Sequence, residues 1–119
     1  MTSDDIVLVF TDIHADIAAI KSIFKCAASS EFISRFGTVN RVINLGDVVG
    51  RGYFPAEAID FIQNLDLEVV SLLGNHDESV MYNWPVAGDD SLASKIHDEF
   101  KKKGEYSDYF KDLKEVYID

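Results

Sequence analysis

The stretch that decides the fold runs from Ile6 to His14 and reads IVLVFTDIH. Five apolar residues, Ile6 to Phe10, are followed at once by a polar turn that contains Asp12 and His14. A short, continuous apolar run rich in β-branched residues is typical of a strand that is buried on both faces. We therefore expect a buried strand whose carboxyl end carries polar, chemistry-bearing side chains.

Two further segments repeat this arrangement along the chain. The apolar run at 42–45 is followed by Gly46–Gly52, which reads GDVVGRG. The run at 68–73 is followed by Gly74–Asp77, which reads GNHD. Each of the three expected strands thus ends in a turn that contains glycine, carboxylate, amide or imidazole groups.

Two helical patterns separate the expected strands. In the first, apolar residues recur at spacings of three and four, and Asp16 is placed to cap the amino end. In the second, Pro55 suits the first helical turn. The two apolar stripes are Ile17, Ile20, Phe24 and Ala27, and then Ala58, Ile59, Ile62 and Leu65. Strands joined by crossover helices predict a β-α-β-α-β order in an α/β fold with a parallel sheet.

The sequence changes character after Asp77. We expect a loop over 83–90, helices over 91–102 and 107–113, and the start of a strand over 116–118. The whole chain, 1–119, is interpreted as one domain, with the motifs in residues 6–77 and a helical region in residues 78–119. Because the chain stops inside an expected strand, we expect it to be cut short.

Composition excludes several classes of protein. The 119 residues include 21 Asp and Glu against 11 Lys and Arg, a net charge of −10. Such an acidic chain repels phosphate backbones, so nonspecific nucleic-acid binding is not expected. The longest apolar runs are far shorter than the roughly 20 residues that a membrane helix needs. The single cysteine, Cys26, forms no intrachain disulfide and is expected to be buried, and the cytoplasm is the expected compartment.

The three polar turns are expected to form one site. In a parallel sheet the carboxyl ends of the strands meet at one edge, where ligands bind. Asp12 and His14, two apart on an extended chain, can hold one metal ion, and Asp47 on the central strand can bridge two. Oxygen and imidazole donors without thiolate suit Mn²⁺, Fe²⁺ or Zn²⁺. The full set expected at this edge is Asp12, His14, Asp47, Asn75, His76 and Asp77.

Each of these motifs has an ordinary structural explanation when taken alone. Asp is common after strands and at helix caps, and a Gly-Asp pair is common in turns. Their occurrence after three consecutive apolar strands favours a functional site over three unrelated turns.

Together, Asp12-x-His14, the Gly46–Gly52 turn and Gly74–Asp77 resemble the first three motifs of the calcineurin-like metallophosphoesterases. The resemblance covers about residues 6–77. At the position of Gly50, the sequence resembles small prokaryotic phosphodiesterases, which often carry glycine there. At the position of Arg51, it resembles serine/threonine protein phosphatases, which share the arginine.

The resemblance implies a β-sandwich flanked by helices, with two divalent metal ions. Mn²⁺ is expected, and Fe²⁺, Zn²⁺ and Ni²⁺ are alternatives. By resemblance Asp12 and His14 bind the first ion, Asp47 bridges both, and Asn75 binds the second. By the same resemblance His76 protonates the leaving oxygen or stabilises the transition state, Arg51 clamps phosphate oxygens, and Asp77 orients His76.

The chain departs from the family in its second half. Members carry further histidine ligands downstream, whereas this sequence has only His14, His76 and His97. We expect His97 to be a solvated residue on the polar side of a helix. The chain is therefore interpreted as the N-terminal part of such a domain. We expect that it either comes from a longer parent chain, or oligomerises or swaps segments to cover its apolar surface.

The predicted function is metal-dependent hydrolysis of phosphate esters by a hydroxide that two metal ions activate. The substrate is expected to be a phosphorylated small molecule, nucleotide or protein. Two alternatives remain: a non-catalytic scaffold of the same fold, and an inactive fragment that lacks the downstream histidine ligands.

Overall fold

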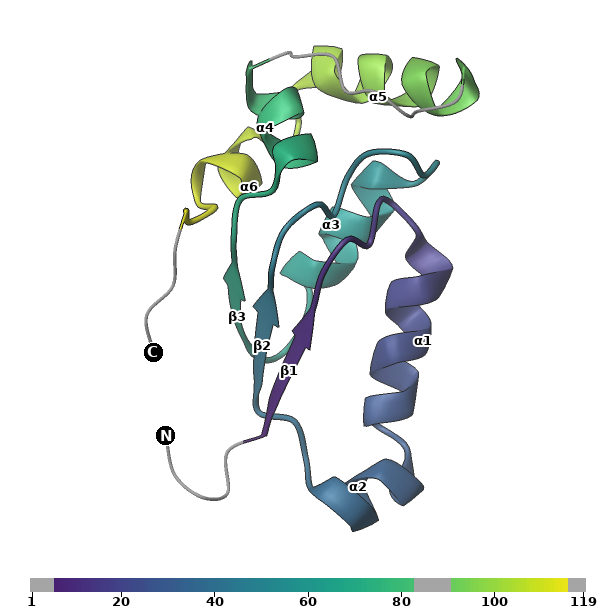
Figure 1. The fold of residues 1–119 in the computed structure, drawn as a ribbon, viewed down its shortest axis with the longest axis vertical. Coiled ribbons are helices and arrows are strands. Elements are labelled where there is room, and N and C mark those ends of the chain that lie inside the picture. The colour runs from purple at the N-terminus through teal and green to yellow at the C-terminus, as the bar shows by residue number, and fades with distance from the viewer. Residues whose placement is uncertain (1–5, 83–90, 116–119) are drawn as a thin grey trace.

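Three short parallel strands form the centre of the molecule (Figure 1). The computed structural model describes residues 6–82 and 91–115. Strand β1 spans Val7–Phe10, β2 spans Arg41–Asn44 and β3 spans Glu68–Ser71. They lie in the order β1-β2-β3, with Val9 paired to Ile43 and Ile43 to Val70. The predicted α/β class and its parallel sheet are confirmed.

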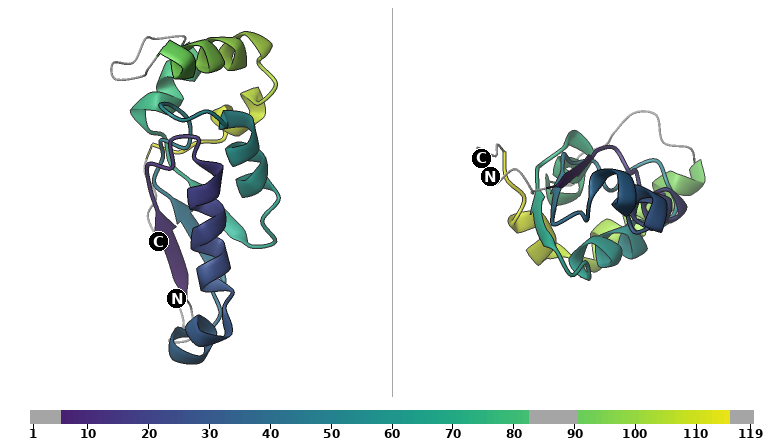
Figure 2. Two further views of the ribbon diagram at one scale, coloured as in Figure 1. Left: turned by 90° about the vertical axis from the view of Figure 1, so that its right-hand side faces the viewer. Right: turned by 90° about the horizontal axis from the view of Figure 1, so that it is seen from below.

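Two crossover helices cover one face of this sheet (Figure 2). Helix α1 spans Ile17–Ala27 and α3 spans Pro55–Gln63. Asp16 caps α1 as expected, with its Oδ1 accepting a hydrogen bond from the Ala19 N–H at 3.0 Å. The expected apolar stripes face the core, whose most deeply buried residues are Ile20, Val42, Val48, Val49, Ala58 and Ile59.

The expectation that the strands are buried on both faces is wrong for β1. Val9 is 52% exposed, whereas Val42 on the helix-covered face is fully buried. Among the described residues, α1 and α3 pack on one face of the sheet, and the other face of β1 carries no helix. Residue hydrophobicity alone therefore overstated how much of this strand is covered.

Two helices lie where the sequence indicated none. Helix α2 spans Ser30–Phe36, with Ser29 as its cap, and α4 spans Asn75–Tyr82. Neither has a regular apolar stripe, since α2 buries no residue and α4 begins within a polar motif. Neither segment therefore has the periodic apolar residues from which an amphipathic helix is predicted.

The remaining helices gather with α4 at the carboxyl end of the sheet (Figure 1). Helix α5 spans Ser91–Lys103 and α6 spans Ser107–Lys111, close to the predicted bounds. After α6, Lys114 forms a parallel bridge to Leu72 at the edge of β3. The loop expected over 83–90 and the strand expected over 116–118 lie outside the described residues.

Two surface features complete the fold. Cys26 is exposed, so its predicted burial is wrong: α1 turns Ile20 and Ala27 to the core and Cys26 away from it. Among the helices described, none is long and apolar enough to span a bilayer.

Candidate metal centre

The turns after β1 and β2 are held together by backbone hydrogen bonds. The Asp12 N–H donates to the Gly46 carbonyl at 3.1 Å, and the His14 N–H donates to the Asp47 carbonyl at 2.9 Å. These bonds continue the pairing of β1 and β2 beyond the end of the sheet. They bring the first two motifs side by side, as the parallel topology predicted.

The sequence predicted an extended backbone at Asp12 and His14. In the structure the backbone of these turns is not extended. Asp12, His14 and Asp47 have φ angles of 56°, 51° and 57°, in the left-handed region. This conformation costs a non-glycine residue about 1–2 kcal/mol, and it clusters at functional sites. The two side chains do lie together, with Asp12 Oδ1 3.2 Å from His14 Nε2, but a tight turn rather than strand alternation puts them there.

His14 is oriented for a cation. Its Nδ1 lies 3.2 Å from the Val49 carbonyl oxygen, which can only accept, so Nδ1 carries the proton. The other ring nitrogen, Nε2, points toward Asp12 and lies 3.2 Å from its Oδ1. A histidine that donates one ring N–H to a backbone carbonyl and offers the other nitrogen is the usual arrangement of a metal ligand.

Asp12 stays ionised over a wide pH range. The Thr11 hydroxyl donates to its Oδ2 at 2.7 Å. This hydrogen bond is the largest of the influences, His14 among them, that lower the pKa of the carboxyl. Asp12 therefore presents a negative charge beside the Nε2 atom of His14.

Asp47 lies at the centre of the cluster. Its Oδ1 accepts from the backbone N–H of His76 at 2.9 Å and lies 3.6 Å from the His76 Nδ1. One donor atom from each of His14, Asp47 and His76 lies within 4.8 Å of the other two. Such a group of two imidazoles and a carboxylate can hold a divalent ion, and it includes His76, which the sequence had assigned to proton transfer.

Asn75 lies against Asp47 at the exposed edge of the cluster. With its amide nitrogen toward Asp47, it donates to Oδ2 at 3.0 Å and to Oδ1 at 3.2 Å. With its oxygen in that place, two acceptors would face each other, which a cation between them would stabilise. The donor set therefore fits a metal ion in the position that the sequence predicted.

Two glycines allow the close packing of this cluster. A Cβ at Gly50 would lie 2.2 Å from the His76 Cδ2, and one at Gly74 would lie 2.2 Å from the Asp47 Oδ1. Neither contact is sterically permitted. The glycines of the second and third motifs are thus required by the positions of His76 and Asp47.

Asp77 connects the second and third motifs from the buried side of the cluster. Its fully buried carboxylate accepts from the backbone N–H groups of Asp47 and Gly74, each at 2.9 Å. Burial raises the pKa of this carboxyl to about 6, although both hydrogen bonds oppose the shift. These contacts connect Asp77 to the Asp47 backbone, a connection that the sequence did not indicate.

Arg51 lies beside the cluster at an open cleft. The side chain is exposed, and the cleft has a volume of about 580 Å³. Asp12 and His14 line the same cleft, together with residues 52–54. A cationic fork next to the cluster could bind the oxygens of an anionic ligand held there.

His97 was expected on the surface, and that expectation is wrong. It is 5% exposed, and its Nε2 lies 3.2 Å from the Gly52 carbonyl oxygen. Helix α5 buries Ala93 and His97, while the apolar side chain of Leu92 is 53% exposed. The spacing of four between Ala93 and His97 was the available signal, but a histidine in a charged segment suggested solvent.

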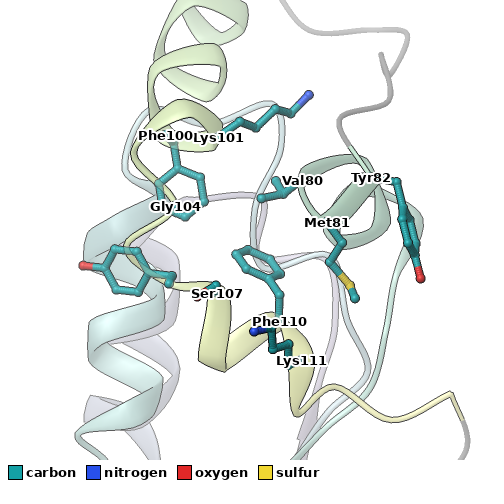
Figure 3. A pocket seen from close by; sticks show the side chains of 10 residues that line it. Val80, Met81, Tyr82, Phe100, Lys101, Gly104, Ser107, Phe110 and Lys111 are labelled. Carbon is teal, nitrogen blue, oxygen red and sulfur yellow. The ribbon is translucent and has the colours of Figure 1, made fainter.

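A separate cavity of about 290 Å³ lies between α4, α5 and α6 (Figure 3). Its walls are mainly apolar side chains, with two lysines among the lining residues. None of the residues that the sequence assigned to metal or substrate lines it. The lining includes Val80, Met81, Phe100, Tyr106, Phe110 and Lys111.

Fold and site together define a metallophosphoesterase-like α/β protein. The structure is similar to that of a metallophosphoesterase from Sphaerobacter thermophilus, with a TM-score of 0.64 and 24% identity. The match covers 95% of this chain and 43% of that one, and it shows a shared fold.

Sequence comparison gives the family. The family model for calcineurin-like phosphoesterases matches residues 6–118, and the chain belongs to that family. It is also 32% identical over 75 residues to "Uncharacterized protein MJ0912" of Methanocaldococcus jannaschii. That match covers 63% of this chain and 27% of the relative, so the chain spans about a quarter of the relative's length. Members of the family bind divalent metals, in agreement with the His14, Asp47 and His76 group.

Proposed function

We propose that this protein hydrolyses phosphate esters with two divalent metal ions. The single observation that carries the proposal is the convergence of His14, Asp47 and His76, whose donor atoms lie within 4.8 Å of one another. The three residues come from three separate segments, two turns and the first turn of α4, and their grouping is hard to explain by local geometry alone. Family membership supports the same chemistry.

In this proposal Asp12 and His14 would hold one ion, Asp47 would be a ligand to both ions, and Asn75 would bind the second. Support comes from the Asp12 to His14 contact of 3.2 Å and from the Asn75 amide against both Asp47 oxygens. When bound, the ions would act as Lewis acids that lower the pKa of water and neutralise phosphate charge. Mn²⁺ is the metal we propose.

Arg51 and His76 are proposed to act on the substrate. Arg51 lies on the cleft with Asp12 and His14, where its N–H donors can pair with phosphoryl oxygens. The His76 ring packs edge-on to that of His14, with 4.7 Å between centroids. From there it can bind an ion or give a proton to the leaving oxygen.

The proposed substrate is a phosphate ester whose phosphoryl group is accessible. The cleft of about 580 Å³ is lined by Asp12, His14 and Arg51 among others, so it suits a phosphoryl group held between metal ligands and a cation. Phosphomonoesters, nucleotides and phosphoproteins all present one. The cytoplasm remains our proposed compartment.

The test is hydrolysis of an aryl phosphate monoester and an aryl phosphodiester with Mn²⁺, before and after chelation. We expect metal-dependent turnover that Asp47→Asn lowers at least about 100-fold, because a shared ligand is lost. Asp66→Asn, an exposed carboxylate in the α3 to β3 turn, is the matched control and should keep full activity.

Two results would count against this proposal. Tight Mn²⁺ binding with no turnover of either ester would favour the non-catalytic scaffold. Equal turnover in Asp47→Asn and in the unaltered protein would contradict the proposed site.

A further inference from the structure

Arg51 is the central residue of a strained three-residue turn. The Gly52 N–H donates to the Gly50 carbonyl at 2.7 Å, and Arg51 has a φ of 62°. This is the geometry of a γ-turn with positive φ, which is rare and strained. Such a turn persists only where the surrounding structure holds it.

Two of its anchors belong to the metal cluster itself. Gly50 packs on the His76 ring, where a Cβ would lie 2.2 Å from Cδ2. Gly52 packs on the His14 carbonyl oxygen, where a Cβ would lie 2.0 Å away. Beyond the turn, the Phe54 N–H donates to the Ala15 carbonyl at 3.2 Å. The turn is therefore pressed against both histidine-bearing segments.

The remaining anchor comes from α5. His97 Nε2 lies 3.2 Å from the Gly52 carbonyl oxygen, 45 residues away in sequence. Because a carbonyl oxygen only accepts, the imidazole must carry a proton on Nε2 and donate it. The ring is 5% exposed, so little water competes for this bond. His97 lies outside the His14, Asp47 and His76 group, so metal binding gives it no role.

We propose that His97 is a positioning residue: by holding Gly52, it fixes the turn that presents Arg51 to phosphate. This inference rests on the proposed function for the phosphate. The physical link is short, since the Gly52 carbonyl is one residue from Arg51. Loss of the donor would let the strained turn relax and Arg51 move away from the cleft.

The first readout needs neither metal nor turnover. Hydrogen exchange of the Gly52 and Phe54 N–H groups is measured in the chelated protein. We expect His97→Leu to speed both amides about tenfold or more, as local opening becomes easier. The Leu45 N–H, bonded to the Phe10 carbonyl at 2.9 Å, should not change.

Two variants separate positioning from general stability. His97→Gln keeps a side-chain N–H donor near the place of Nε2 and should exchange within about threefold of the unaltered protein. Ala93→Gly weakens α5 at a fully buried site but keeps His97. Equal local acceleration by Ala93→Gly at the same loss of stability would overturn the inference, as would no acceleration in His97→Leu.

The second readout is binding of inorganic phosphate to the Mn²⁺-loaded protein by calorimetry. His97→Leu should weaken phosphate about 5- to 10-fold while leaving Mn²⁺ affinity unchanged, and should have no further effect in an Arg51→Ala background. An unchanged phosphate affinity would overturn the link to Arg51. If the unaltered protein binds Mn²⁺ but no phosphate, the proposed function fails, and with it the link from the turn to phosphate. Hydrogen exchange still decides whether His97 holds the turn.

Discussion

The buried carboxylate of Asp77 accepts a hydrogen bond from the backbone N–H of Asp47 at 2.9 Å, across 30 residues of sequence. The same Oδ2 accepts from Gly74 at 2.9 Å. One side chain thus fixes the backbone of the central candidate ligand and the turn that precedes α4. The geometry of the metal centre depends on a residue that need not touch metal.

Removing this carboxylate should destabilise the protein. Asp77→Ala leaves two buried N–H donors without their acceptor, and we expect a loss of about 2–4 kcal/mol in the free energy of unfolding. Asp77→Asn keeps an acceptor oxygen and should cost about half as much. Urea unfolding checks both, with the exposed Asp66→Ala as control; equal effects of Asp66→Ala and Asp77→Ala would contradict this role.

The stability of the chelated protein should depend on the ionisation of Asp77. Its pKa of about 6 lies above the ordinary value of 3.8, so the folded state binds a proton that the unfolded state does not. Unfolding free energy should therefore rise by about 2–3 kcal/mol as the pH falls from 7 to 4. Asp12, whose pKa is lowered, loses its own contribution below 3.8 and so outside this window.

The contribution of Asp77 is isolated by difference. Unfolding is followed at each pH for the unaltered chain and for Asp77→Asn, which does not titrate. The difference should be flat above about pH 6, should change steadily as the pH falls toward 3.8, and should level off below that value. A flat difference between pH 7 and 4 would show that the Asp77 carboxyl titrates normally.

Substitution of a glycine that contacts the cluster should weaken Mn²⁺ binding far more than substitution of a distant glycine. Gly50→Ala and Gly74→Ala push a methyl group against His76 and Asp47, and each should weaken Mn²⁺ binding at least about tenfold. Gly104 also has a positive φ, of 61°, but no atom within 4 Å of its Cβ position. Gly104→Ala should cost only about 1 kcal/mol of stability and leave Mn²⁺ affinity unchanged. A loss of Mn²⁺ affinity in all three variants alike would refute the packing argument.

The two faces of the sheet should differ in their sensitivity. Val42 is fully buried, and Val42→Thr should cost about 2 kcal/mol because a hydroxyl enters the core. Val9 is 52% exposed, and Val9→Thr should change stability by less than about 0.5 kcal/mol. The sequence predicts self-association that covers apolar surface; if the exposed face of β1 takes part in it, Val9→Lys should lower the mass measured by light scattering. A large loss of stability in Val9→Thr would mean that the face is covered.

The strands and the site cluster were predictable for one physical reason. Short apolar runs such as Val7–Phe10 favour strands of a central sheet, and the carboxyl ends of parallel strands meet at one edge. The meeting of Asp12 and His14 with Asp47 follows from that topology. The site did not require knowledge of side-chain packing.

The parts that were missed depend on tertiary contacts. Helix α4 has no apolar stripe, and its first residues are positioned by hydrogen bonds to Asp47. Asp12 has a left-handed backbone and donates its N–H to the Gly46 carbonyl, a contact between residues 34 apart. The burial of His97 depends on Gly52, far away in sequence. No local pattern contains that information.

The most direct test of the central claim is a calorimetric titration of this chain with Mn²⁺, beside Asp47→Asn and the control Asp66→Asn. We expect Mn²⁺ binding that Asp47→Asn weakens at least about 100-fold and Asp66→Asn leaves unchanged, because Asp47 is the shared ligand. Mn²⁺ binding of equal strength in all three proteins would contradict a metal centre at His14, Asp47 and His76.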